Sequence, residues 1–225
     1  YIFEKVFRNY SAKQWGVPAD SLDASVLRRV PVIIGKDDRY FPDSIQMMPI
    51  FGYTELFENM LRHPSISVHL NSDALKRVRP HAPSGKFLLD GVPFDGPVCF
   101  TGSIDELFDY ALGALPYRSL ELCLEDYPVD YYQNATVVNY PNEENFTRIT
   151  EFKHMTLQDI PNATTIMKEY PIAFHPGGRM VPFYPIQTDE NRSLYSDYLS
   201  LCGKYDRLYL CGRLAEYRYL NMDAV

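Results

Sequence analysis

Aromatic and cationic side chains dominate the residues of this sequence that could do chemistry. The chain has 18 tyrosines, and its 22 basic residues are 14 arginines and 8 lysines. Tyrosine offers a ring that stacks and a hydroxyl that hydrogen-bonds, while arginine binds phosphate through two parallel N–H groups. Together they suit a phosphorylated ligand that carries a ring. The same counts also fit a half-exposed β-sheet whose arginines face solvent, and composition alone favours that explanation.

Several of these residues occur in short segments that could meet in one cleft. Tyr10 and Trp15, the only tryptophan, lie at the end of a predicted first helix, and two arginines at 28–29 lie in or beside a loop. The remaining candidates are Arg39, Tyr40, Arg118, Arg148, Tyr184, Arg213, Tyr219 and Asn221. Spacing along the chain leaves their convergence a hypothesis.

The motifs of several common enzyme classes are missing from the sequence. There is no GxxxxGK[ST], GxSxG, HExxH or GxGxxG segment. The cysteines form no CxxC pair and the histidines have no zinc-site spacing, so no metal site is predicted. Asp105, Glu106 and Asp109 could act as general acids or bases. Their place at the start of a predicted helix has a plainer explanation, because acidic side chains there complement the helix dipole.

Length and charge narrow the class of protein further. A chain of 225 residues with 46% hydrophobic and 23% charged residues is typical of one globular domain or two small ones. The net charge of −7 argues against nucleic acid as a partner. No apolar run approaches the roughly 18 residues of a membrane-spanning helix, and the first residues do not form a signal peptide. Unpaired cysteines favour the cytoplasm.

Hydrophobic periodicity predicts an α+β fold, a helical segment followed by a largely antiparallel β-sheet. Helices are expected over 1–16, from Pro18 or Ala19 through Leu27, over 52–62, 104–113 and 189–203, with loop over most of 31–52. Strands are expected over 66–70, 117–125, 134–140, 147–155 and 164–170, with Asp-Gly turns at 90–91 and 95–96. Residues 207–213 read as a buried strand, and 219–225 as the start of a further helix.

Five long segments resemble the UDP-galactopyranose mutase family. They are NYSAKQWG, DDRYFPDSIQMMPIFGYTELFENML, TGSIDELFDYALGALPYRSL, FTRITEFKH and GRLAEYRYLNMD, and they occur in order over nearly the whole chain. The resemblance implies a flavoprotein isomerase that interconverts UDP-galactopyranose and UDP-galactofuranose for surface polysaccharide biosynthesis. It implies reaction through an adduct between the sugar and N5 of the reduced flavin. It also implies an FAD-binding domain, a helical domain and an antiparallel sheet around one cleft.

The resemblance also implies roles for individual residues. Arg29, on the family's mobile loop, and Arg148 would be the catalytic residues and bind the diphosphate. The other substrate-binding residues would be Phe7 and Tyr10 at the uracil, Trp15 in the pocket, and Tyr40, Tyr184 and Tyr219 at the phosphates. The flavin contacts would come from Arg213, Tyr219, Asn221 and Met222. Arg118 lies in an equally good motif, and a ligand contact and a role in supporting the sheet both stay open.

The sequence departs from the family because it lacks the GxGxxG region, and its first residue is Tyr1. We therefore expect a piece of a longer protein. Residues 1–65 would be part of the helical domain, 66–205 the substrate-binding sheet domain, and 206–225 the returning strand and helix start of the FAD-binding domain. The strand over 207–213 would then lack the sheet that it joins.

The cofactor and partners that we expect follow from this comparison with the family. FAD belongs to the parent protein and is expected to be absent from this chain, which would be inactive alone. The partners would be the UDP-sugars, the missing FAD-binding domain and, as a further possibility, a second copy of the chain. The alternatives are a non-catalytic UDP or UDP-sugar binding module, or an inactive truncated homologue.

Overall fold

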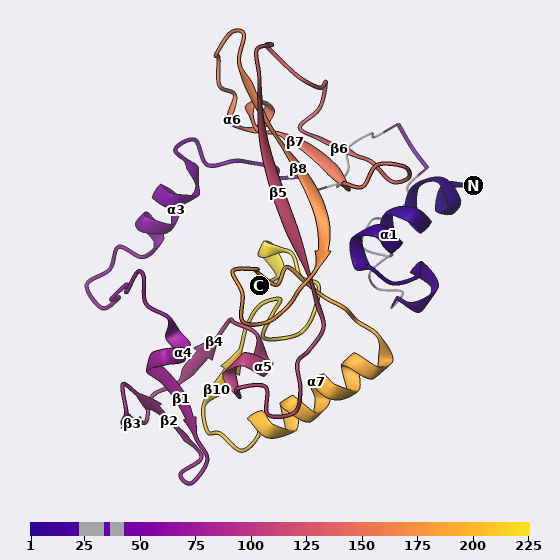
Figure 1. Ribbon diagram of the computed structural model, residues 1–225. Helices are drawn as coiled ribbons and strands as arrows, with labels where there is room; N and C mark the ends of the chain where they lie inside the picture. Colours follow the sequence, from indigo (N-terminus) through magenta and orange to yellow (C-terminus); the bar gives the residue numbers. More distant parts are fainter. Residues whose placement is uncertain (23–33, 37–42) are drawn as a thin grey trace.

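The computed structural model describes residues 1–22, 34–36 and 43–225. A long antiparallel sheet forms one part of the molecule, with the first helix beside it (Figure 1). A second part holds short strands and the longest helix (Figure 1). Helices and antiparallel strands therefore occur together, which confirms the α+β prediction.

The first helix is formed as the sequence predicts. A π-helical turn η1 (Phe3–Phe7) continues into α1 (Arg8–Trp15), which ends at Gly16 in the left-handed conformation, φ 68°. Only glycine adopts that conformation without cost, so the sequence marks this end clearly.

The second predicted helix differs from the expectation. A 3₁₀ turn, η2 (Ala19–Ser21), begins where the helix was predicted, but the backbone at Leu22 is extended. The Ser21 hydroxyl donates to the Pro18 carbonyl at 2.7 Å and closes the turn locally. The helix is therefore interrupted at Leu22, and its predicted continuation through Leu27 lies outside the described residues.

The helix α3 (Gly52–Met60) is confirmed, while the strand predicted over 66–70 is wrong. Residues 43–51 form loop, as expected. Residues 61–74 are all exposed, and no described strand pairs with 66–70. An alternating pattern needs a hydrogen-bonded neighbour to become a strand, and this segment has none.

Five antiparallel strands make the main sheet, in the order β6-β7-β8-β5-β9. They are β5 (Tyr117–Tyr127), β6 (Val137–Asn139), β7 (Arg148–Glu151), β8 (Thr164–Ala173) and β9 (Tyr184–Pro185). All four segments predicted as successive strands are confirmed, although β5 pairs with β8 rather than with its successor β6. The third strand ends earlier than expected, because Phe152 takes the helical conformation and starts α6 (Lys153–Thr156).

The second part of the molecule begins with α4 (Ala74–Arg77) and a small meander. Its strands are β1 (Val78–His81), β2 (Lys86–Leu89) and β3 (Val92–Phe94). Asp90 and Gly91 have φ values of 51° and 82°, the conformation of a two-residue hairpin turn, as predicted. The helix predicted over 104–113 is shorter: α5 (Ile104–Leu107) ends because Asp109 and Tyr110 take positive φ.

The C-terminal strand has a partner, contrary to expectation. β10 (Leu208–Leu210) pairs in parallel with β4 (Val98–Phe100). The strand was predicted to be buried, but β10 is only partly buried. Its middle residue, Tyr209, is 60% exposed. The main core packs α5, β5 and α7 (Asp189–Cys202) around these strands. The last element is a 3₁₀ turn, η3 (Met222–Ala224).

Candidate functional site

Three aromatic rings form a small cluster where α1 meets β9 and the C-terminal segment. The Trp15 ring lies 5.7 Å from that of Tyr184 and 5.5 Å from that of Tyr219, both edge to face. Tyr184 and Tyr219 lie 5.4 Å apart. Trp15 and Tyr184 are buried, and Leu22 packs against them. The structure thus brings together three residues that are far apart in the sequence.

Arg213 lies over two of these rings. Its guanidinium carbon is 4.4 Å from the centre of the Tyr219 ring and 5.3 Å from that of Tyr184. Its N–H groups donate to the carbonyl of Leu220 from Nε and Nη2, at 3.2 and 2.7 Å, and to that of Phe183 from Nη1. Arg213 therefore shapes the loop that carries Tyr219, and these three N–H groups are not offered to a ligand.

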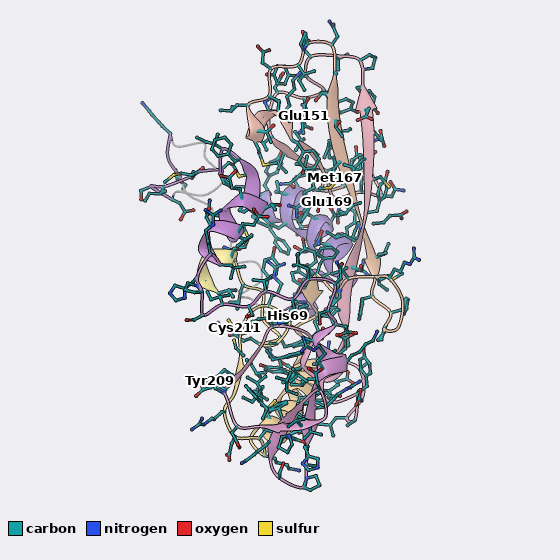
Figure 2. All side chains as sticks on the ribbon, turned by 90° about the vertical axis from the view of Figure 1, so that its left-hand side faces the viewer. His69, Glu151, Met167, Glu169, Tyr209 and Cys211 are labelled. Carbon is teal, nitrogen blue, oxygen red and sulfur yellow. The ribbon has the colours of Figure 1, made fainter. Side chains whose placement is uncertain are left out.

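Arg148 on β7 joins the helix to the sheet. Its Nη2 donates to the Tyr10 hydroxyl at 3.1 Å. Its Nε lies 3.2 Å from Glu169 Oε2, an ion pair without hydrogen-bond geometry. Register explains the pairing, since Arg148 on β7 lies directly opposite Glu169 on β8. Glu169 lies midway along the sheet (Figure 2).

The charges of this group act on one another. Burial works to lower the pKa of Arg148, but Tyr10, Glu169, Tyr184 and Tyr219 outweigh it and raise that pKa. Burial raises the pKa of Glu169, which is 8% exposed, and Arg148 offsets part of that rise. Burial raises the pKa of Tyr184 to about 12. At neutral pH the site therefore holds a cationic arginine and a protonated tyrosine, both able to donate to an anion.

Arg118 supports this arrangement from the sheet. Its Nε donates to the backbone carbonyl of Gln14 at 3.1 Å, at the C-terminal end of α1, where a cation is favourable. A Cβ at Gly16 would lie 2.8 Å from Arg118 Nη1, so the helix end and the guanidinium fit closely. Of the two roles left open for Arg118, this contact supports the structural one.

The other predicted site residues share no described hydrogen bond or ring contact with the aromatic cluster, or lie outside the described residues. Phe7 lies one turn before Tyr10 and is half-buried. Asn221 and Met222 are exposed beyond Tyr219. Arg29 and Tyr40 lie outside the described residues.

Sequence reasoning missed two polar residues beside the site. Glu169 is the carboxylate that faces Arg148. The sequence could have indicated it, because it is a charged residue at an inward-facing position of a predicted strand. The Gln14 side chain is buried, and neither its amide nitrogen nor its oxygen has a hydrogen-bond partner among the described residues.

Asp105 is a core residue and not an acid or base in a cleft. It is 1% exposed, and its Oδ2 accepts from the Leu115 N–H at 2.8 Å. Neither the functional explanation nor the helix-dipole explanation anticipates this contact, which closes the turn between α5 and β5.

The part of the chain that the structure describes holds neither a cluster of metal ligands nor a membrane-spanning helix. There, no three His, Cys, Asp or Glu side chains gather as metal ligands would. Within the same residues, every helix is too short or too polar to cross a bilayer.

Comparison with known proteins decides the family. The family model described as UDP-galactopyranose mutase matches residues 5–219. The chain belongs to the UDP-galactopyranose mutase family. The assignment agrees with the sequence resemblance, because the matched range includes Tyr10, Arg148 and Tyr219.

Proteins with similar sequences come from several bacteria. The UDP-galactopyranose mutase of Mycoplasma pneumoniae is 38% identical over 224 residues, covering 97% of this chain and 55% of that protein. That of Mycoplasma genitalium is 35% identical, covering 99% and 55%. The dTDP-fucopyranose mutase of Escherichia coli is 34% identical, covering 99% and 57%. The chain spans a little over half the length of these relatives.

Proposed function

We propose that this chain is the nucleotide-sugar-binding part of a UDP-galactopyranose mutase, an isomerase that interconverts UDP-galactopyranose and UDP-galactofuranose. The observation that carries the proposal is the meeting of Tyr10, Trp15, Arg148, Tyr184 and Tyr219 from four separate segments. A ring-bearing diphosphate needs an aromatic surface and fixed cationic donors, and this group offers both. The relatives named as UDP-galactopyranose mutases support the substrate class.

Each residue has a physical role in this proposal. Tyr10 and Phe7 contact the uracil, while Trp15 lines the pocket. Arg148 binds the diphosphate and stabilises its charge when the bond to the sugar breaks. Tyr184 and Tyr219 donate hydrogen bonds to phosphate oxygens through their hydroxyl groups. Arg29 and Tyr40 would complete the site.

FAD is proposed for the parent protein. The described residues make only a small part of such a site, because Arg213 directs three N–H groups to backbone carbonyls. The Tyr219 ring, Asn221 and Met222 remain to face a flavin. A reduced flavin, when bound, supplies the nucleophile for the sugar carbon. The chain's own residues bind and orient the nucleotide, and we propose that without the rest of the protein they do not turn over substrate.

The remaining expectations are also proposals. The domain boundaries after residues 65 and 205, and association with a second copy, rest on the family resemblance. We propose the cytoplasm as the compartment, supported by four cysteines that are all free.

Titration with UDP, followed by tryptophan fluorescence, tests the proposed site. Trp15 is the only tryptophan, so the signal has one source. We expect a saturable change in the wild-type chain, and at least a tenfold weaker affinity in Arg148→Ala, since a charge-assisted contact is worth about 1.5–3 kcal/mol.

Arg79→Ala is the matched control. Arg79 forms an exposed ion pair with Asp109 at 2.9 Å, in the other part of the molecule, so its removal should leave the affinity unchanged. A folded wild-type chain that gives no response to UDP would contradict the proposal. Binding without turnover after reconstitution of a full-length protein with FAD would favour the non-catalytic module.

A further inference from the structure

Lys13 fastens α1 to a loop that is distant in the sequence. Its Nζ donates to the backbone carbonyls of Tyr140 at 2.5 Å, Glu144 at 2.7 Å and Phe146 at 2.9 Å. An ammonium group has three N–H donors, so these three carbonyls use all of them. The carbonyls belong to the loop between β6 and β7, and they converge on a single point. Lys13 therefore has no N–H left for a ligand.

This loop leads directly into the arginine of the candidate site. The Tyr140 N–H donates to the Thr147 carbonyl at 2.9 Å and closes the loop one residue before Arg148. On the helix, Tyr10 lies three residues before Lys13, which places the two side chains near each other on one side. The Lys13 contacts and the Arg148–Tyr10 hydrogen bond thus join the same two elements.

The other contacts between helix and loop are weaker. Asn9 Nδ2 donates to Asn142 Oδ1 at 3.1 Å, and Asn142 Nδ2 donates to the Lys5 carbonyl at 3.3 Å. Both are exposed and join neutral groups, so water competes with them. Two of the three Lys13 contacts are part-buried and carry a full charge. Lys13 is therefore the main attachment between the loop and the helix.

We infer that Lys13 is a positioning residue for nucleotide binding, which sets Tyr10 and Trp15 on α1 relative to Arg148 on β7. It acts through the helix and the loop and does not touch the ligand. Arg118 holds the end of the same helix from the sheet, so the two cations fix α1 at two points. The inference rests on the proposed function, because the helix that Lys13 positions carries the proposed uracil contact.

A second lysine in the chain provides a matched control. Lys153 in α6 also donates to three backbone carbonyls, those of Asp130 at 2.9 Å, Ala163 at 3.0 Å, and Ile160. It lies at the opposite end of the main sheet from α1 (Figure 1). Lys13→Met and Lys153→Met therefore remove the same number of hydrogen bonds to backbone carbonyls, one set beside the site and one away from it. Lys153 also lies 5.0 Å from the centre of the Tyr131 ring, so its removal costs the fold at least as many contacts.

Two measurements on these variants test the inference. The first is the affinity for UDP, and the second is acrylamide quenching of Trp15 fluorescence without ligand. We expect Lys13→Met to raise the Kd for UDP at least tenfold and to increase the quenching of Trp15. Lys153→Met should leave the Kd within twofold of wild type and the quenching unchanged. This should hold even if it lowers the melting temperature as much as Lys13→Met does. Lys13→Gln, which keeps two N–H donors, serves where the methionine variant does not fold, and should give an intermediate Kd.

The outcomes separate this inference from the proposed function. Wild-type affinity and wild-type quenching in both Lys13 variants overturn the inference, as does an equal loss of affinity in Lys13→Met and Lys153→Met. A folded wild-type chain that does not bind UDP overturns the proposed function and the role in nucleotide binding. The quenching comparison then still decides whether Lys13 sets the position of α1.

Discussion

At the scale of single residues, cations that bind backbone carbonyls organise much of this molecule. Arg213 closes the loop before Leu220, Arg118 holds the end of α1, and Lys153 ties two loops together. Sequence reasoning expected Arg213 to contact a ligand, and for Arg118 it left a ligand contact and a role in supporting the sheet both open. It could not find the carbonyl contacts themselves, because a carbonyl acceptor is present at every residue and leaves no signal in the side-chain pattern. Arg148 was among the residues expected to meet in one cleft, and the structure places it against the side chains of Tyr10 and Glu169.

Asp105 should make the stability of the fold depend on pH. Burial raises the pKa of Asp105 in the folded chain, partly offset by the Leu115 N–H. Folding therefore favours the protonated form, and the free energy of unfolding falls as pH rises through this pKa. Asp105→Asn removes the charge and keeps the shape. We expect the variant to gain about 1 kcal/mol over wild type at pH 7.5, and little at pH 4, because only the ionised carboxylate of the wild type bears the free-energy cost of a buried charge.

Thermal unfolding at the two pH values measures this difference. Asp109→Asn is the control, since Asp109 is exposed and also has positive φ, which asparagine tolerates. Equal gains in the two variants, or a gain in Asp105→Asn that does not change with pH, would sink the idea.

At the scale of elements, local signals predicted some helix ends and turns, and long-range pairing decided the arrangement of the strands. Gly16 marked the end of α1, and Asp90-Gly91 marked a hairpin, because both need positive φ. The order β6-β7-β8-β5-β9 was beyond prediction, since any of several antiparallel neighbours would suit β5. Residues 66–70 had a strand pattern, but no strand in the described part of the chain pairs with them.

The junction between α1 and the sheet should be sensitive to one methyl group. Gly16→Ala places a Cβ in the left-handed region and 2.8 Å from Arg118 Nη1. The Arg118 guanidinium must then shift, which weakens its hydrogen bond to the Gln14 carbonyl. We expect a loss of about 2–4 kcal/mol in the free energy of unfolding, from backbone strain of about 1–2 kcal/mol and the weakened charge-assisted bond.

Gly91→Ala isolates the strain. Gly91 also has positive φ, but its Cβ would meet no atom within 4 Å. Chemical denaturation of both variants should show the larger loss at Gly16. If the two losses agree within error, Arg118 does not fit the helix end closely.

At the scale of the whole molecule, α3 and its flanking loops lack a cover among the described residues. Its apolar side chains are exposed, since Phe57 is 50% and Met60 is 66% exposed. The sequence pattern identified the helix correctly. It could not show that nothing in the described part of the chain packs there, because that depends on the arrangement of all the elements.

This apolar surface should bind a hydrophobic dye without contributing to stability. We expect Phe57→Lys to lower the fluorescence of bound ANS by about half, while the melting temperature stays within about 2 °C of wild type, since exposed substitutions change stability by about 0.5 kcal/mol or less. Phe87→Lys, in the main core, should by contrast unfold the chain. A large fall in melting temperature for Phe57→Lys would show that the helix is packed after all.

The parallel pair of β4 and β10 has a consequence for the order of events during synthesis. β4 leaves the ribosome about 110 residues before β10, which at 5–20 residues per second is a delay of roughly 5 to 20 s. During that interval β4 lacks β10, its partner strand among the described residues, and Phe100 on β4 lacks part of the main core. A nascent chain paused before residue 208 should therefore be a good client for a chaperone that binds exposed apolar segments. Release from that chaperone would begin once β10 has emerged and the strands have paired.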